Sequence, residues 1–178
     1  QYGQGTQKNL KKAFELYTLS ANQGDAISQN NLAYMYENGN YIEKDLKKAF
    51  DLYTLSASQG NDAAQNNLGY MYKHGKYIEK DLKKAFELYT LSANQGNATA
   101  QNNLGYMYQH GNYIKKDLKK AFELYTLSAN QGNATAQNNL ANMYKKGKGT
   151  QKDLEKAFEL YTLSANQGNA EAQYNLAY

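Results

Sequence analysis

The chain contains no cysteine, no proline and no tryptophan, and all 20 of its basic residues are lysines. Without cysteine it has neither a disulfide framework nor a thiolate that could act as ligand or nucleophile. Cysteine usage therefore does not indicate whether the chain works in an oxidising or a reducing compartment. Without arginine it lacks the planar side chain that binds phosphate through two parallel hydrogen bonds. No apolar run approaches the ~20 residues that cross a bilayer, and no signal peptide is visible. We therefore expect no membrane insertion.

The sequence is dominated by a repeat. The segment AFELYTLSANQG starts at residues 13, 85, 121 and 157, and a fifth copy starts at residue 49 with two differences, Asp51 and Ser58. Successive copies thus start 36 residues apart. This interval is typical of solenoids built from helix pairs, which grow linearly and have no single central core.

Each period contains a longer predicted helix. Asp45 can accept amide protons of its first turn, and Gly60 can close its last turn. Between them, apolar residues follow a helical spacing along one face. Leu52 and Leu55 widen that face, so we expect other helices to cover more than one side. The expected longer helices span residues 9–23, 45–59, 81–95, 117–131 and 153–167.

Each period also contains a shorter predicted helix. Asn97 can cap its start and Gly111 its end, and Gly105 would let another helix approach closely. No stretch alternates with period two, so we expect no strands. The expected shorter helices span residues 26–37, 62–73, 98–109, 134–145 and 170–178.

The repeat resembles a known family. Residues 98–111 read A-x-A-Q-x-N-L-G-x-M-Y-x-x-G, and residues 116–132 read K-D-x-x-K-A-x-x-x-Y-x-x-x-A-x-Q-G. These segments resemble the two halves of a SEL-one-like repeat (SLR), a relative of the tetratricopeptide repeat. The resemblance covers nearly the whole chain. It implies an all-α fold, a right-handed superhelical α-solenoid of about five 36-residue helix pairs, with residues 1–178 as a single domain.

Two features depart from the SLR pattern. The family usually has tryptophan before the tyrosine of the longer helix, where this chain has leucine, as at Leu124. It also has a Gly-x-Gly-Val loop, whose second glycine is replaced by Tyr41, Tyr77 and Tyr113 in the three central loops. Because tyrosine tolerates a positive φ far less well than glycine, we expect these loops to follow another path. The three tyrosines could form an exposed stripe along one edge, beside buried isoleucines.

The sequence does not indicate catalysis or metal binding. A serine and a carboxylate recur in every copy, but a regular ladder gives each member nearly the same environment, whereas a nucleophile needs its own base and orienting group. His74 and His110 occupy equivalent positions, about 10 Å apart in stacked helices, which is too far for one zinc ion. We expect no enzyme activity, no metal site and no cofactor.

Paired lysines, such as Lys47 and Lys48, occur early in each longer helix. They could follow a phosphate backbone, as helical repeats of similar length do when they bind RNA. However, arginine is absent, and acidic side chains recur one turn along the same helix. We therefore expect a mixed-charge, solvated face and no nucleic-acid partner.

The shorter helix carries the candidate binding residues. Residue types vary at one of its positions (Glu37, Lys73, Gln109, Lys145), which suggests exposure. In SLR proteins the first helix of each pair lines the concave surface, which implies a ladder of asparagines and tyrosines along the groove. Such side chains suit peptide binding, although the tyrosines could instead stack between repeats. The candidate residues are Tyr34, Asn66, Asn67, Tyr70, Asn102, Asn103 and Tyr106.

Two N-glycosylation patterns begin at Asn97 and Asn133. Such triplets arise by chance in a repeat rich in asparagine and threonine, and we expect both asparagines to serve as helix caps. They would be modified only in a chain exported from a eukaryotic cell.

SLR proteins generally act as adaptors in larger assemblies, often in secretory, envelope or signalling contexts. The resemblance therefore implies a non-enzymatic scaffold that binds a protein or peptide along its concave face. Some cysteine-rich bacterial members have been linked to β-lactam binding, but this chain lacks their cysteines. The alternative is a structural subunit that stacks head to tail into a filament. Five periods would total 180 residues against the 178 present, so the chain is either a segment of a longer array or completes its helix pairs by end-to-end association.

Overall fold

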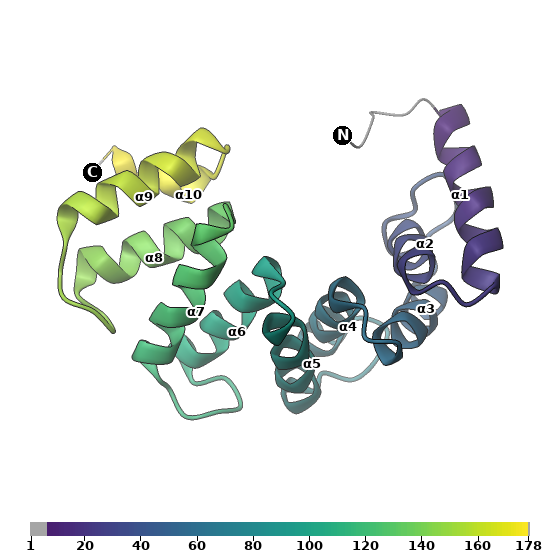
Figure 1. The fold of residues 1–178 in the computed structure, drawn as a ribbon, viewed down its shortest axis with the longest axis horizontal. Helices are drawn as coiled ribbons and strands as arrows, with labels where there is room; N and C mark the ends of the chain where they lie inside the picture. The colour runs from purple at the N-terminus through teal and green to yellow at the C-terminus, as the bar shows by residue number, and fades with distance from the viewer. Residues whose placement is uncertain (1–6, 178) are drawn as a thin grey trace. The chain divides into compact units, whose positions relative to one another are not determined.

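The computed structural model describes residues 7–177, with the side chains of residues 9–177. This part consists of ten α-helices and no β-strand, which confirms the predicted all-α fold of 36-residue helix pairs (Figure 1). We call the first helix of each pair the A helix and the second the B helix. The A helices are α2 (Ala26–Asn38), α4 (Asp62–His74), α6 (Ala98–His110), α8 (Ala134–Lys146) and α10 (Ala170–Leu176). The B helices are α1 (Gln7–Asn22), α3 (Leu46–Ser58), α5 (Leu82–Asn94), α7 (Leu118–Asn130) and α9 (Leu154–Asn166).

The expected difference in helix length is absent in the interior of the chain. Both α3 and α4 contain 13 residues, because the B helix starts one residue after its capping aspartate and the A helix runs up to its terminal glycine. The last helix, α10, ends at Leu176. The expected helix extended to Tyr178, which lies outside the described residues.

The chain divides into two compact units, residues 1–88 (unit 1) and 89–178 (unit 2). In unit 1, α2 packs on α1 and α3, and α3 packs on α4. In unit 2, α7 packs on α6 and α8, and α9 packs on α8 and α10 (Figure 1). Within each unit, helices that follow each other in sequence therefore pack together, as in a helix-pair repeat. The single domain and its right-handed superhelix stay predictions.

The helix ends follow from local sequence. Each A helix begins at an Asx side chain that accepts a hydrogen bond from the backbone N–H three residues later: Asp25, Asn61, Asn97, Asn133 and Asn169. Four A helices end at a glycine in the left-handed conformation: Gly39, Gly75, Gly111 and Gly147. Asp45 caps α3 in the same way, and Gly60 follows that helix with a φ of 88°. These caps confirm the predicted roles of Asp45, Gly60, Asn97 and Gly111.

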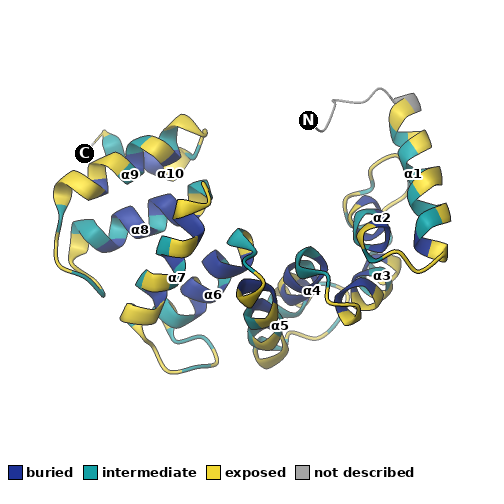
Figure 2. Ribbon diagram, viewed as in Figure 1, coloured by how far each residue is buried: buried dark blue, intermediate teal, exposed yellow. Residues whose placement is uncertain are grey.

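Each unit has its own core where A and B helices face each other (Figure 2). Tyr53 of α3 packs with Leu68 and Met71 of α4 in unit 1, and Tyr125 of α7 packs with buried residues of α8 in unit 2. A Cβ at Gly105 would lie 2.9 Å from Cε1 of Tyr125, so this glycine permits close packing of α6 on α7. The expected burial of Leu55 is wrong, because the outer side of α3 remains open to solvent.

The recurring serines and glutamines connect neighbouring repeats. The Oγ of Ser56 donates a hydrogen bond to the carbonyl of Ala26 at 2.6 Å, and Ser128 and Ser164 make the equivalent bond in unit 2. Nε2 of Gln59 donates to Oε1 of Gln29 at 2.7 Å. Because these serines are fully buried and bonded to backbone, they hold the stack together and are unavailable as nucleophiles.

The three tyrosine loops correct one sequence expectation. Tyr41, Tyr77 and Tyr113 have φ values of 74°, 70° and 71°, close to the 73° of Gly149 at the equivalent position of the fourth loop. The loops therefore keep the left-handed residue despite its cost for tyrosine. Aromatic contacts offset that cost, since the Tyr41 ring lies 5.9 Å from that of Phe14, and Tyr77 lies 5.8 Å from Phe50. All three tyrosines are exposed, while the isoleucines beside them are half-buried.

Candidate partner-binding surface

The A helices carry a ladder of asparagines. Nδ2 of Asn67 donates to Oδ1 of Asn30 at 3.1 Å, which joins α4 to α2. In unit 2, Asn139 donates to Asn102 at 3.0 Å and Asn175 donates to Asn138 at 3.2 Å. These side chains bond one repeat to the next, and the Asn-Asn pair that recurs in the first four A helices was the sequence signal for it.

This ladder places two of the candidate binding residues below the surface. Asn66 is 8% exposed and Asn102 is 9% exposed, so these two asparagines are not exposed along the A helices as expected. Asn66 donates instead to Asn67, which is half-buried like Asn103. The asparagines thus form the floor of the A-helix surface.

The candidate tyrosines stand above this floor. Tyr34, Tyr70 and Tyr106 occupy one position on α2, α4 and α6 and are 53%, 39% and 39% exposed. His74 packs on Tyr70 and His110 on Tyr106, each pair with ring centroids 4.2 Å apart. Each histidine therefore makes a tilted ring contact with the exposed tyrosine of its own A helix. Partial burial, followed by the charges of Lys73, Lys76 and Lys80, lowers the pKa of His74.

In unit 1 this surface holds an ion pair. Nζ of Lys76 lies 3.1 Å from Oε1 of Glu37, and the hydroxyl of Tyr53 donates to Oε2 of the same carboxylate at 3.0 Å. Lys76 also lies over the ring of Tyr70, 4.6 Å from its centroid. Burial, and secondly the charge of Glu37, raise the pKa of the Tyr53 hydroxyl. We call these three groups, Lys76, Tyr53 and Glu37, the unit 1 carboxylate centre.

The position of Glu37 corrects the expectation that variable residue types at one A-helix position mean solvent exposure. Glu37, Lys73, Gln109 and Lys145 are all half-buried, so their variety does not reflect free exposure. Two of them contact the next B helix: Glu37 accepts a hydrogen bond from Tyr53, and Lys145 lies 5.8 Å from the ring centroid of Tyr161.

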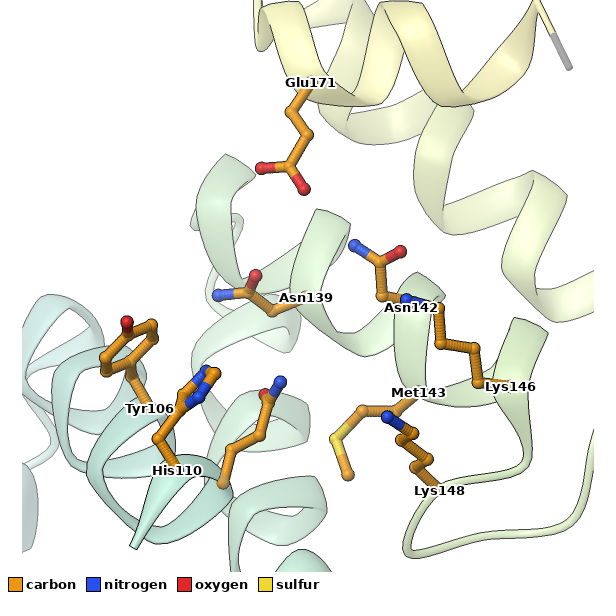
Figure 3. Close-up of a pocket in the computed structure, with 9 residues that line it drawn as sticks. Tyr106, His110, Asn139, Asn142, Met143, Lys146, Lys148 and Glu171 are labelled. Carbon is orange, nitrogen blue, oxygen red and sulfur yellow. The ribbon is translucent and has the colours of Figure 1, made fainter. Parts of the chain in front are cut away.

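Unit 2 has a pocket of about 280 Å³ on the same A-helix surface. Figure 3 shows Tyr106 and His110 on one side, Lys146 and Lys148 on the opposite side, and Glu171 of α10 on a third. The remaining lining residues are Gln109, Asn139, Asn142 and Met143. Two ammonium groups and several amides thus surround a space large enough for one side chain of another molecule.

The lysines of the B helices have structural contacts. Lys48, Lys84 and Lys120 lie over the rings of Tyr36, Tyr72 and Tyr108, at 5.0, 4.9 and 5.1 Å from the centroids. Lys48 and Lys84 are also paired with the aspartates that precede their helices. In these three helices, one lysine of each pair therefore contacts a neighbouring tyrosine ring near the helix start. This supports the expectation that the lysines belong to a solvated face of mixed charge.

The remaining candidate sites have simple positions. Oδ1 of Asn97 accepts a hydrogen bond from the N–H of Ala100, and Oδ1 of Asn133 accepts one from the N–H of Ala136, each at 2.9 Å. The asparagines of both N-glycosylation patterns are therefore helix caps. Over residues 7–177, no three His, Cys, Asp or Glu side chains are grouped to hold a metal ion. In that same part of the chain, no helix has the length and apolar character needed to cross a membrane.

Comparison with known proteins identifies the repeat. The family model of the Sel1 repeat matches residues 1–25, 26–61, 62–97, 98–133, 134–169 and 170–178. Among curated proteins, no sequence matches the chain.

Several solved structures are similar to the chain. A Sel1 repeat protein from Oxalobacter formigenes is 34% identical with a TM-score of 0.85, over 92% of this chain and 65% of its own. A protective antigen with an SLR fold from uropathogenic Escherichia coli strains is 34% identical with a TM-score of 0.84, over 93% of this chain and 35% of its own. Cysteine rich protein B of Helicobacter pylori is 26% identical with a TM-score of 0.56, over 75% of this chain and 97% of its own.

The chain thus spans about two thirds of the Oxalobacter protein and about one third of the Escherichia antigen. The family match, in contrast, extends from its first residue to its last. The chain belongs to the Sel1-repeat family.

Proposed function

We propose that this chain is a non-enzymatic scaffold that binds a protein partner along the surface of its A helices, the concave surface in SLR proteins. Sel1-repeat proteins generally mediate protein–protein interactions. One observation carries the proposal: an exposed tyrosine stands at the same position of three A helices, at Tyr34 and Tyr70 in unit 1 and at Tyr106 in unit 2.

Tyrosine suits such a role because its ring covers a large area with few rotatable bonds and its hydroxyl can bond a polar group. The tilted ring contacts with His74 and His110 restrict two of these rings, Tyr70 and Tyr106, which lowers the entropy lost when a partner binds. The hydrogen-bonded asparagine floor holds the helices that carry them.

The test starts from a partner captured with the intact chain and identified by mass spectrometry. Its dissociation constant is then measured with the wild type and with Tyr70→Ala/Tyr106→Ala. We expect at least a tenfold weaker complex, since aromatic anchors that dominate an interface contribute about 2 kcal/mol or more. A matched control is Leu55→Ala/Leu127→Ala, which removes exposed side chains of the B helices. Equal effects of the two double variants, or lost helicity in the tyrosine variant, would contradict the proposal.

A second candidate function is head-to-tail assembly. Phe158 of α9 is 64% exposed and borders an apolar hollow with Leu154 and Leu176, whereas the equivalent Phe122 is half-buried and packs on Tyr144 at 5.3 Å. An aromatic side chain of a second copy could cover Phe158 as Tyr144 covers Phe122. Sedimentation velocity over a concentration series tests this: association that Phe158→Glu abolishes supports assembly, and a monomer at high micromolar concentration rejects it.

A further inference from the structure

The two units differ in the centre built from Lys76, Tyr53 and Glu37. In unit 1, the ammonium of Lys76 and the hydroxyl of Tyr53 converge on the carboxylate of Glu37. The residues at the same repeat positions in unit 2, two periods of 36 residues later, are Lys148, Tyr125 and Gln109. Unit 2 therefore retains both donors but has an amide in place of the carboxylate.

The backbone places the two lysines in the same way. Gly75 and Gly147 end their A helices with φ of 66° and 61°, and the N–H of the lysine after each donates to a methionine carbonyl at 3.0 Å. Lys148 and Gln109 both line the 280 Å³ pocket, so they face the same space.

The donors in unit 2 lack acidic partners among the described residues. Lys146 and Lys148 form no ion pair there, in contrast to Lys76. The hydroxyl of Tyr125 is buried and makes no hydrogen bond to the described part of the protein. Burial, and secondly the interaction with the pocket residue Tyr106, raise the pKa of that hydroxyl, although Tyr125 itself is not one of the residues that line the pocket.

We propose that the unit 2 pocket receives an acidic side chain, glutamate or aspartate, from the protein partner. The incoming carboxylate would supply in unit 2 the negative charge that Glu37 supplies in unit 1: it would pair with Lys148 beside Gln109, with Lys146 as a second cation. This inference rests on the proposed function and specifies the partner's chemistry at one point of the A-helix surface.

The electrostatic setting favours one carboxylate over a polyanion. The basic groups that line the pocket are Lys146, Lys148 and His110, and Glu171 is its one carboxylate. Glu171 would repel the neighbouring charges of a phosphate backbone, while a single carboxylate can lie on the lysine side. Without arginine, the pocket also lacks the bidentate group typical of phosphate recognition.

A first experiment needs no partner. Gln109→Glu places a carboxylate at the repeat position of Glu37, in the pocket that Lys148 also lines. We expect the midpoint of thermal unfolding to rise, and the new carboxyl to titrate below the ordinary range of glutamate in NMR. A lower midpoint with a raised pKa would show that the pocket does not accept a carboxylate, and would overturn the inference whatever the partner is.

The second experiment uses a displayed library of random 12-residue peptides, selected on the intact chain. We expect enrichment in Glu and Asp, and a selected peptide should lose about tenfold in affinity when its key acid is replaced by the matching amide, as for one hydrogen bond to a charged group. The same replacement should have no effect on binding to Lys148→Gln. Lys119→Gln, an exposed lysine of α7 outside the pocket, is the matched control and should behave as wild type.

The outcomes separate the two proposals. Peptides that bind the A-helix surface without acid preference would overturn this inference and leave the scaffold function standing. Binding of the oligonucleotide (dT)20 that Lys148→Gln removes would overturn it in favour of a phosphate site. Failure to select any peptide would contradict peptide binding at this surface altogether, and the inference with it.

Discussion

Tyr53 and Tyr125 occupy one repeat position and are both fully buried, yet the same substitution should affect them differently. Tyr53→Phe removes a hydroxyl that donates to a carboxylate at 3.0 Å. A hydrogen bond to a charged group contributes about 1.5–3 kcal/mol, so we expect the free energy of unfolding to fall by about that amount. Glu37 keeps Lys76 as a partner, which favours the lower end of the range.

Tyr125→Phe should be close to neutral or stabilising. Its hydroxyl has no hydrogen-bond partner in the described protein, and a buried polar group in that state costs roughly 1–3 kcal/mol. Phenylalanine keeps the ring and its contacts with Ala121 and Leu140 while removing that cost.

Urea unfolding of the two variants provides the assay, with hydrogen exchange of α3 and α7 as a local readout because repeats can unfold independently. A loss at Tyr125→Phe as large as at Tyr53→Phe would refute the reasoning, since it would mean that the Tyr125 hydroxyl is satisfied in solution.

Three further predictions concern the loops and caps. Ile78→Ala should lower the free energy of unfolding by about 1–4 kcal/mol because it removes a half-buried apolar side chain, and replacing the exposed Tyr77 by alanine should cost less in the same urea titration. Gly149→Tyr should destabilise unit 2 in hydrogen exchange, because a Cβ there would overlap the carbonyl oxygen of Leu118, although tyrosine is native at the three equivalent positions. The Asp45 carboxylate accepts a hydrogen bond from the backbone N–H of Lys48, which lowers the pKa of this carboxyl below its ordinary value of 3.8. The cap therefore stabilises the fold fully above the ordinary pKa. Its contribution disappears as the pH falls through the lower pKa of the folded state. Asp45→Asn should flatten this part of the acid-unfolding curve followed by circular dichroism, and an unchanged curve would contradict the role of the cap.

The parts of the fold that depend on neighbouring residues could be predicted from the sequence. Asn97 and Gly111 delimit α6 because a cap needs only the backbone within one turn. The repeat period then fixed which helices pack together, since each copy must bury its apolar face on the next.

Features that depend on contacts between repeats could not be predicted in the same way. The burial of Asn66 depends on how closely α4 approaches its neighbours, which the pattern of one helix does not contain. The positive φ of Tyr41 is tolerated because its ring packs on Phe14, 27 positions earlier in the chain. Variation at the position of Glu37 suggested exposure, but that carboxylate is held by Lys76 from the following repeat.

The most direct test of the scaffold proposal maps where a ligand binds. A selected peptide or identified partner is titrated into the isotope-labelled chain, and amide shifts are followed by NMR. We expect the largest changes on α4 around Tyr70, on α6 around Tyr106 and in the loop after α8 around Lys148, with small changes on the B helices. Changes centred on the outer side of α3 and α7, around Leu55 and Leu127, would contradict binding along the A-helix surface.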